Sequence, residues 1–152
     1  MGSGWLDFAS HFFLPRSPMT FNELHLDPAL LAALPAELHT PTRIQQLAIP
    51  AALKGQDLLA LAQTGSGKTL AFGLPLLQRL DSASDRVQGL VLVPTRELAT
   101  QVSAALLGGA EALGLRLLTL CGGVAQEQQQ AELALGPQLL VATPGRLRDL
   151  LA

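Results

Sequence analysis

The sequence predicts an α/β fold, in which a parallel β-sheet carries helices on both faces. Three apolar runs, at residues 89–93, 115–121 and 138–142, are nearly continuous in valine and leucine. This pattern is typical of strands that are buried on both sides in a parallel sheet. Helix-like stretches lie between the runs, and such an alternation of strand with helix favours the parallel arrangement.

The remaining elements can be placed in chain order. Thr40 is expected to cap a helix at about 42–53 and Pro41 to begin it, since threonine is a preferred N-cap and proline suits the first turn. The apolar run at 57–61 predicts one more strand. Further helices are expected at about 27–34, 68–80, 95–113 and 126–134.

The composition is that of one compact domain. Of the 152 residues, 49% are hydrophobic, which is enough to form a core. The net charge is −2, so any contact with nucleic acid has to be local. Cys121 is the single cysteine, which predicts a buried apolar role for this thiol and a reducing location, the cytoplasm. No apolar stretch approaches the length of a membrane span, so no membrane partner is expected.

Residues 1–18 differ from the rest of the chain. They contain Trp5 and three of the five phenylalanines, and prolines end the segment. Asp7 interrupts the apolar core that a secretory signal would need. We interpret the segment as a natural extension, a misassigned start or a cloning remnant, with Met19 as the alternative start. The domain is therefore expected to occupy residues 19–152.

Residues 62–69 are typical of a phosphate-binding loop between a strand and a helix. The loop reads Ala62, Gln63, Thr64, Gly65, Ser66, Gly67, Lys68 and Thr69. Its glycines let successive backbone N–H groups turn toward an anion at the start of the helix. Lys68 would reach the β- and γ-phosphates and Thr69 would bind Mg²⁺, which makes these two the candidate catalytic residues. The alternative interpretation is a glycine-serine turn that happens to precede a helix.

Two of the predicted strands end in similar sequences. Thr95 and Thr143 each come just after a strand and each would cap the next helix, and Arg96 and Arg146 follow closely. The carboxyl ends of parallel strands share one edge of a sheet, so these helix starts are expected beside the phosphate-binding loop. Free N–H groups there can hold several phosphates. The alternative is ordinary capping with solvated arginines.

The order of these motifs resembles the DEAD-box RNA helicases, and bacterial members most of all. The resemblance covers about residues 20–152 and rests on residues 40–45, 62–69, 94–99, 122–123 and 143–146. It implies a RecA-like domain that, paired with a second one, binds ATP and RNA and separates short duplexes.

The resemblance also implies residue roles in ATP binding. Gln45 would recognise adenine, because an amide can bond both the N6 amino group and N7, and Phe21 would stack on the base. The alternatives are a solvated glutamine and a core phenylalanine. The same resemblance adds Arg43 to the ATP site, together with the loop 62–69 and its Mg²⁺.

Contacts with RNA are implied for the three loops that follow the strands. They would bind the phosphate and sugar groups of RNA, so this binding would not depend on the base sequence. The residues are Pro94, Thr95, Arg96, Glu97, Gly122, Gly123, Thr143, Pro144, Gly145 and Arg146. The run 126–130, rich in glutamine, is instead expected to be a solvated helix face.

Hydrolysis needs further carboxylates, one to hold Mg²⁺ and one to position water. In the family these belong to the Asp-Glu-Ala-Asp motif, which would lie beyond Ala152, and Asp149 falls within a predicted helix. The chain is therefore expected to be the front part of a longer helicase and inactive alone. A nucleotide- or RNA-binding module without turnover, and a different P-loop ATPase or kinase, are the alternatives.

Overall fold

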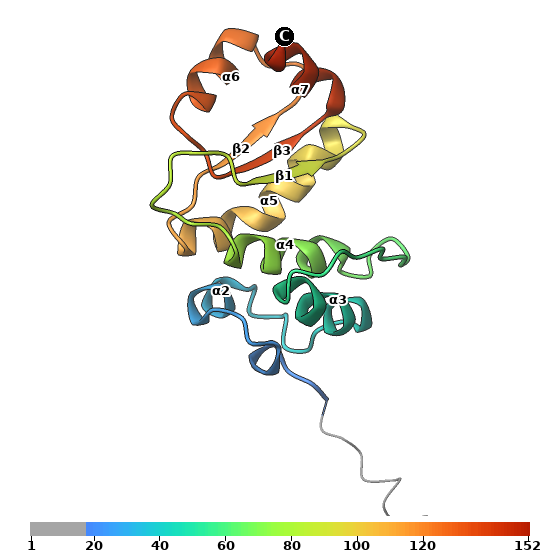
Figure 1. Cartoon of the computed structure of the whole chain (residues 1–152). Helices are drawn as coiled ribbons and strands as arrows, with labels where there is room; N and C mark the ends of the chain where they lie inside the picture. The colour runs from blue at the N-terminus through green and yellow to red at the C-terminus, as the bar shows by residue number, and fades with distance from the viewer. Residues whose placement is uncertain (1–17) are drawn as a thin grey trace, which may run out of the picture.

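The computed structural model describes residues 18–152, so the interpretation of the first 17 residues lies outside the described part. The elements are stacked in layers, from α6 and α7 through the sheet to α5, α4 and α3 (Figure 1). In chain order they are η1 (Phe21–Leu24), α2 (Pro28–Ala33), α3 (Arg43–Leu53), α4 (Lys68–Gln78), β1 (Gly89–Leu92), α5 (Arg96–Ala112), β2 (Leu117–Leu120), α6 (Gln126–Leu133), β3 (Leu139–Ala142) and α7 (Pro144–Leu151).

The sheet is parallel, as the sequence predicts. Its three strands have the order β1-β3-β2, so β3 is central. Gly89 and Leu117 both lie opposite Leu139 in the register. All four residues of β3 are buried, which explains why this segment shows no alternation of polar and apolar residues.

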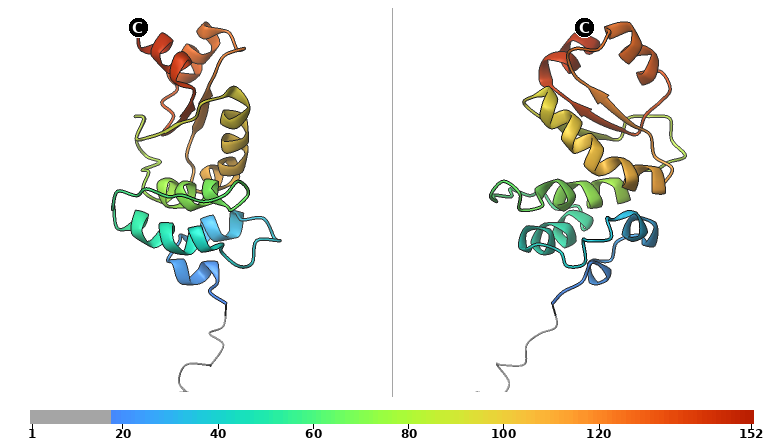
Figure 2. Two further views of the ribbon diagram at one scale, coloured as in Figure 1. Left: turned by 90° about the vertical axis from the view of Figure 1, so that its right-hand side faces the viewer. Right: turned by 180° about the vertical axis from the view of Figure 1, so that it is seen from behind.

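Helices cover both faces of the sheet, which confirms the predicted fold class (Figure 2). Leu139 and Val141 of β3 belong to the main core with residues of α4 and α5. Leu140 and Ala142 point to the opposite face, where Leu147 of α7 packs with leucines of β2 and α6. Among the described residues, no helix combines the length and the apolar character needed to cross a membrane.

The start of α3 corrects one prediction. Its N-cap is Thr42, and Thr40 and Pro41 precede the helix. The side chain of Gln45 reaches back, and its Oε1 accepts a hydrogen bond from the backbone N–H of Thr42 at 2.9 Å. A glutamine at the third helical position stabilises the residue three positions earlier as the cap, and this bond places the cap two residues later than predicted.

The strand predicted at residues 57–61 is wrong, because this segment forms no strand in the structure. Leu59 and Leu61 are 90% and 85% exposed. Leu58 and Ala60 line a pocket of about 590 Å³ that Val91 and Leu92 of β1 also line. An extended segment becomes a strand only when a neighbour supplies hydrogen bonds, and in the described structure none lies beside this one.

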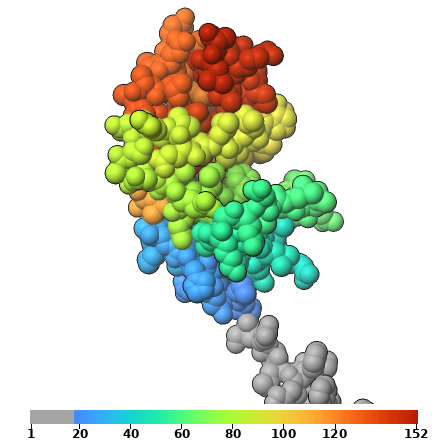
Figure 3. Space-filling model, viewed as in Figure 1, coloured from blue at the N-terminus to red at the C-terminus, as the bar shows by residue number. Residues whose placement is uncertain are grey.

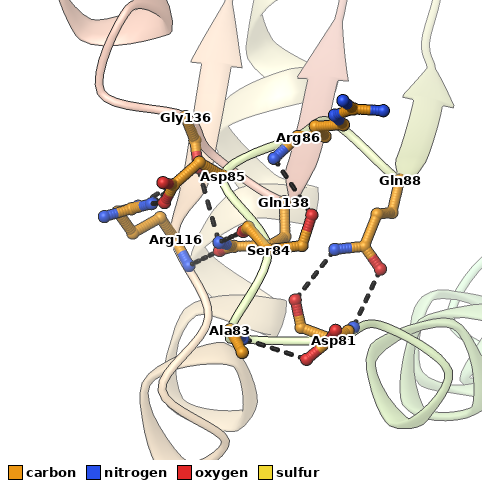
Figure 4. A network of polar contacts seen from close by, with 9 residues as sticks. All are labelled: Asp81, Ala83, Ser84, Asp85, Arg86, Gln88, Arg116, Gly136 and Gln138. Atoms are coloured by element: carbon orange, nitrogen blue, oxygen red, sulfur yellow. Dashed lines mark hydrogen bonds and ion pairs between the residues drawn. The ribbon is translucent and has the colours of Figure 1, made fainter.

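A polar network joins the amino ends of the strands (Figure 4). Gln138 is 1% exposed, and its Oε1 accepts from the backbone N–H of Arg116 at 2.7 Å while its Nε2 donates to the carbonyl of Ser84. Arg116 donates to the carbonyl of Gly136 at 2.9 Å and pairs with Asp85 at 2.9 Å. The loop 81–88 is thus fixed to the edge of the sheet opposite the predicted site.

Candidate functional site

The loop 62–69 has the backbone that its glycines predict. Gly65 and Gly67 have φ of 80° and 85°, a left-handed conformation that residues with a side chain adopt at a cost. Gly67 is the N-cap of α4, so the loop leads directly into the amino end of this helix. Backbone N–H groups at a helix start without intrahelical partners are suited to bind an anion.

The side chains of the loop also fit a phosphate group. The hydroxyl of Ser66 is buried and has no hydrogen-bond partner among the described residues. Lys68 donates from Nζ to the carbonyl of Ala62, so the ammonium group lies across the loop. Lys68 and Thr69 line the 590 Å³ pocket together with Val93 and Leu98 beyond β1. Figure 3 shows a hollow on this side, between the projecting green segment and the yellow start of α5.

Gln45 connects α3 to the phosphate-binding loop. It is 2% exposed, so the alternative of a solvated glutamine is wrong. Its Nε2 donates to the carbonyl of Gly67 at 3.1 Å. A Cβ atom at Gly67 would lie 2.4 Å from this Nε2, so close packing against Gln45 is a second reason for glycine there. The sequence did not predict this contact between the two motifs.

The other two residues assigned to the base lie in different surroundings. Phe21 is 5% exposed and packs in the main core, in agreement with the alternative of a core phenylalanine. Part of it lines a pocket of about 420 Å³ formed with the segment 34–39. Arg43 is exposed at the first position of α3. A stacking role for Phe21 stays a prediction.

The three loops assigned to RNA meet at the carboxyl edge of the sheet, as the parallel topology requires. Thr95 caps α5, and its hydroxyl accepts from the backbone N–H of Leu98 at 3.2 Å. Thr143 is the N-cap of α7, but its side chain makes no capping bond; its backbone N–H donates to the carbonyl of Leu120 at 3.0 Å. The cap predicted for Thr143 is therefore correct in position only.

The glycine pair lies between the two arginines. Gly123 has φ of 90°, and a Cβ atom there would lie 2.4 Å from Nη1 of Arg96. On the other side, Nη1 of Arg146 donates to the carbonyl of Val124 at 3.0 Å. Arg96 is more than half exposed and forms a loose ion pair with Glu97 at 3.9 Å. Two cationic groups thus flank one turn, which suits the binding of phosphates along a chain.

One residue of the site was missed. Gln129 lies within the run 126–130, for which a solvated face was predicted, but it is 1% exposed. Its Oε1 accepts from Arg146 at 3.1 Å. Leu133, one helical turn later, packs against the sheet. This spacing of four residues is the signal that places Gln129 on the buried side of α6.

A comparison with family models decides the family. The model described as DEAD/DEAH box helicase matches residues 42–152, most of the chain. The chain belongs to this family. In this DEAD/DEAH box helicase sequence, the loop 62–69 and the three edge loops all lie within the matched region.

Individual relatives agree. The chain is 49% identical over 131 residues to the ATP-dependent rRNA helicase RRP3 of Debaryomyces hansenii, covering 86% of this chain and 28% of the relative. It is 46% identical over 134 residues to the probable ATP-dependent RNA helicase ddx27 of Dictyostelium discoideum, covering 86% of this chain and 17% of that protein. A crystal structure of a DEAD box protein from the hyperthermophile Methanococcus jannaschii matches with a TM-score of 0.77 and 36% identity, covering 86% of this chain and 36% of that one.

This DEAD/DEAH box helicase chain therefore spans about a quarter of the length of the first of these relatives. The structural match supports the RecA-like nature of the fold. The relatives named above are not bacterial, and the bacterial resemblance stays a prediction.

Proposed function

We propose that this chain provides the ATP-binding loop and the first RNA-contacting surfaces of an ATP-dependent RNA helicase, whose whole chain couples ATP hydrolysis to the separation of RNA duplexes. One observation carries the proposal: the loop 62–69 presents left-handed glycines, a buried hydroxyl without a partner and a lysine at the amino end of α4. Such an arrangement binds the phosphates of a nucleotide.

Residues 65–69 of the loop have defined roles in this proposal. The backbone N–H groups of residues 65–69 and the hydroxyl of Ser66 would bond phosphate oxygens. Lys68 would exchange the carbonyl of Ala62, an uncharged acceptor, for a phosphate oxygen, because a bond between two charged groups is stronger. The Thr69 hydroxyl would hold Mg²⁺, which when bound offsets the negative charge of the phosphates.

Recognition of adenine is assigned to Gln45, together with Phe21 upstream in the chain and Arg43, which lies two residues before Gln45. Both ends of the Gln45 amide have protein partners, namely Thr42 and Gly67. An adenine would therefore have to replace or share one of these bonds. Such sharing would link the base to the conformation of the phosphate-binding loop.

RNA is assigned to the carboxyl edge of the sheet, at residues 94–97, 122–123 and 143–146. The bonds would come from arginines and backbone N–H groups, so binding would not depend on base sequence. The second RecA-like domain, expected in the same longer chain, would complete both sites. We expect the present chain to bind without appreciable turnover, and we expect the whole protein to be cytoplasmic.

The decisive experiment compares ATPase activity with and without single-stranded RNA, for this chain and for a version extended downstream. RNA-stimulated hydrolysis in the extended version alone would support the proposal. Absence of nucleotide binding to either version would contradict it. The family match argues against a different P-loop ATPase, whereas RNA and nucleotide binding without turnover in the extended version would favour a non-catalytic module.

A further inference from the structure

The buried glutamine of α6 lies between two of the loops assigned to RNA. Gln129 is 1% exposed, although the adjacent Gln128 and Gln130 are exposed. Both ends of its amide have partners. Nε2 donates to the carbonyl of Cys121 at 3.0 Å, and Oε1 accepts from Nη1 of Arg146 at 3.1 Å. A buried amide that is bonded at both ends fixes the relative position of the two groups that it joins.

These two groups follow neighbouring strands in the chain. Cys121 follows β2 and directly precedes the glycine pair, whereas Arg146 lies in the first turn of α7, after β3. The backbone of Val124 accepts a second bond from the same nitrogen of Arg146 at 3.0 Å. The guanidinium is thus held against the loop 122–124 by one side chain and one carbonyl.

The remaining donors of Arg146 are the ones that matter for a ligand. A guanidinium has five N–H donors in a planar fork. Both recorded side-chain bonds of Arg146 use Nη1, so the other nitrogens keep donors for a phosphate oxygen. Binding to a flexible arginine includes the entropy cost of ordering it, and a guanidinium ordered in advance avoids that cost.

We propose that Gln129 is a positioning residue for RNA binding, which holds Arg146 in one orientation before RNA arrives. The inference rests on the proposed function, in which Arg146 contacts an RNA phosphate. Gln129 itself does not touch the RNA in this account. It acts through Arg146 alone, and Cys121 anchors it to the sheet.

Three substitutions separate this role from a general effect on the fold. Gln129→Met removes both bonds but keeps the length of the side chain. Gln129→Glu keeps an acceptor for Arg146 and loses the donation to Cys121, because a carboxylate oxygen then faces the carbonyl of that residue. Gln130→Met is the matched control, because it makes the same change at an exposed neighbour on the same helix.

The first measurement needs no RNA. Guanidinium N–H signals of Arg146 are recorded by ¹⁵N NMR on the free chain and its variants. We expect restricted, slowly exchanging signals in the wild type, in Gln129→Glu and in Gln130→Met, and their loss in Gln129→Met. Signals that stay equally restricted in Gln129→Met would overturn the proposal.

The second measurement is RNA affinity, from the anisotropy of a labelled single-stranded oligonucleotide. Gln129→Met is expected to lower the affinity roughly two- to tenfold, which corresponds to the cost of ordering one long side chain. Gln129→Glu should restore most of it, and Gln130→Met should bind as the wild type does. In an Arg146→Ala background, Gln129→Met should cause no further loss.

The outcomes distinguish the two proposals. An equal loss from Gln129→Met with and without Arg146 would mean that Gln129 acts through the fold, and it would overturn the positioning role while the RNA contact stands. If Arg146→Ala binds RNA as tightly as the wild type, the RNA contact itself fails, and the role of Gln129 in binding fails with it.

Discussion

Two loops of this chain are rich in polar groups, and they differ in where those groups find partners. In the loop 81–88, Asp81 and Gln88 exchange two hydrogen bonds of 2.8 Å, and Ser84 and Asp85 bond to Gln138 and Arg116 (Figure 4). In the loop 62–69, the Ser66 hydroxyl has no partner in the described structure and Lys68 bonds only a backbone carbonyl.

This is the difference that we expect between a structural loop and a binding loop. Polar groups that are bonded to one another hold the chain in place and offer nothing to a ligand. Polar groups left without partners cost stability unless a ligand later bonds them, so they are informative where they occur. If this comparison is correct, substitutions in the first loop should change stability and those in the second should change binding.

The largest effect is expected from Lys68→Ala. Loss of the cationic partner of the phosphates should weaken ATP binding by about 2–5 kcal/mol, because one side of a charged hydrogen-bonded pair is removed. The melting temperature should stay close to that of the wild type. Isothermal titration calorimetry with Mg²⁺-ATP measures the binding.

Lys54→Ala is the matched control for this change, because Lys54 is the only other lysine and lies outside the loop, at the end of α3. Unchanged ATP affinity in Lys68→Ala would contradict the assignment of the loop and remove the basis of the comparison.

Gln138→Leu should give the opposite result. It leaves the N–H of Arg116 and the carbonyl of Ser84 without their partner, so unfolding by urea should show a loss of about 2–3 kcal/mol. ATP affinity of the folded fraction should not change. Gln88→Leu, at an exposed position of the loop 81–88, is expected to cost less than half as much. Similar losses of stability in Gln138→Leu and Gln88→Leu would mean that the cost of removing a glutamine does not depend on its burial.

Gln45 does not fit either of the two loops in the comparison. Its amide groups already have partners within the protein, although we expect the side chain to bind adenine. The amide matches the N6 and N7 groups of adenine but not the two acceptors O6 and N7 of guanine. The chain should therefore prefer ATP to GTP by about 1–2 kcal/mol, the worth of one mismatched hydrogen bond. Competition titrations that give equal affinities would limit Gln45 to its contact with Gly67.

The smallest effect is expected from Asp85→Asn. The carboxylate is largely exposed, and exposed ion pairs contribute little, so the free energy of unfolding should change by less than about 0.5 kcal/mol. The difference should shrink further in high salt. The loss of one buried hydrogen bond costs about 1 kcal/mol or more. A loss of that size that does not depend on salt would show that the pair of Asp85 and Arg116 is part of the buried network.

Much of the fold could be predicted because the apolar runs and the glycines of the loop 62–69 determine the local structure by themselves. The run 138–142 is buried on both faces of the sheet, and its composition alone shows it. The left-handed glycines of the loop 62–69 follow from the motif. The edge loops come together because the strands are parallel, a property that the alternation of strand and helix already indicates.

The parts that could not be predicted depend on contacts between distant residues. The cap at Thr42 results from the way in which Gln45 reaches back, and Gln45 itself is buried by the loop at Gly67. The segment 57–61 has a strand-like composition, but a strand also needs a neighbour. Gln129 has the same residue type as its exposed neighbours, and its bonds to Cys121 and Arg146 come from segments distant in the sequence.

The position of β3 has a consequence for the order of events during synthesis. Among the described strands, β1 and β2 do not pair with each other, and both pair with β3, the last of the three in chain order. At ribosomal speeds of about 5–20 residues per second, β1 waits roughly 2–10 s for its partner. The helices α4 and α5 can form and pack beforehand, since they contact each other. The three described strands therefore come together in one step, when β3 is made, on a helical layer that is already in place.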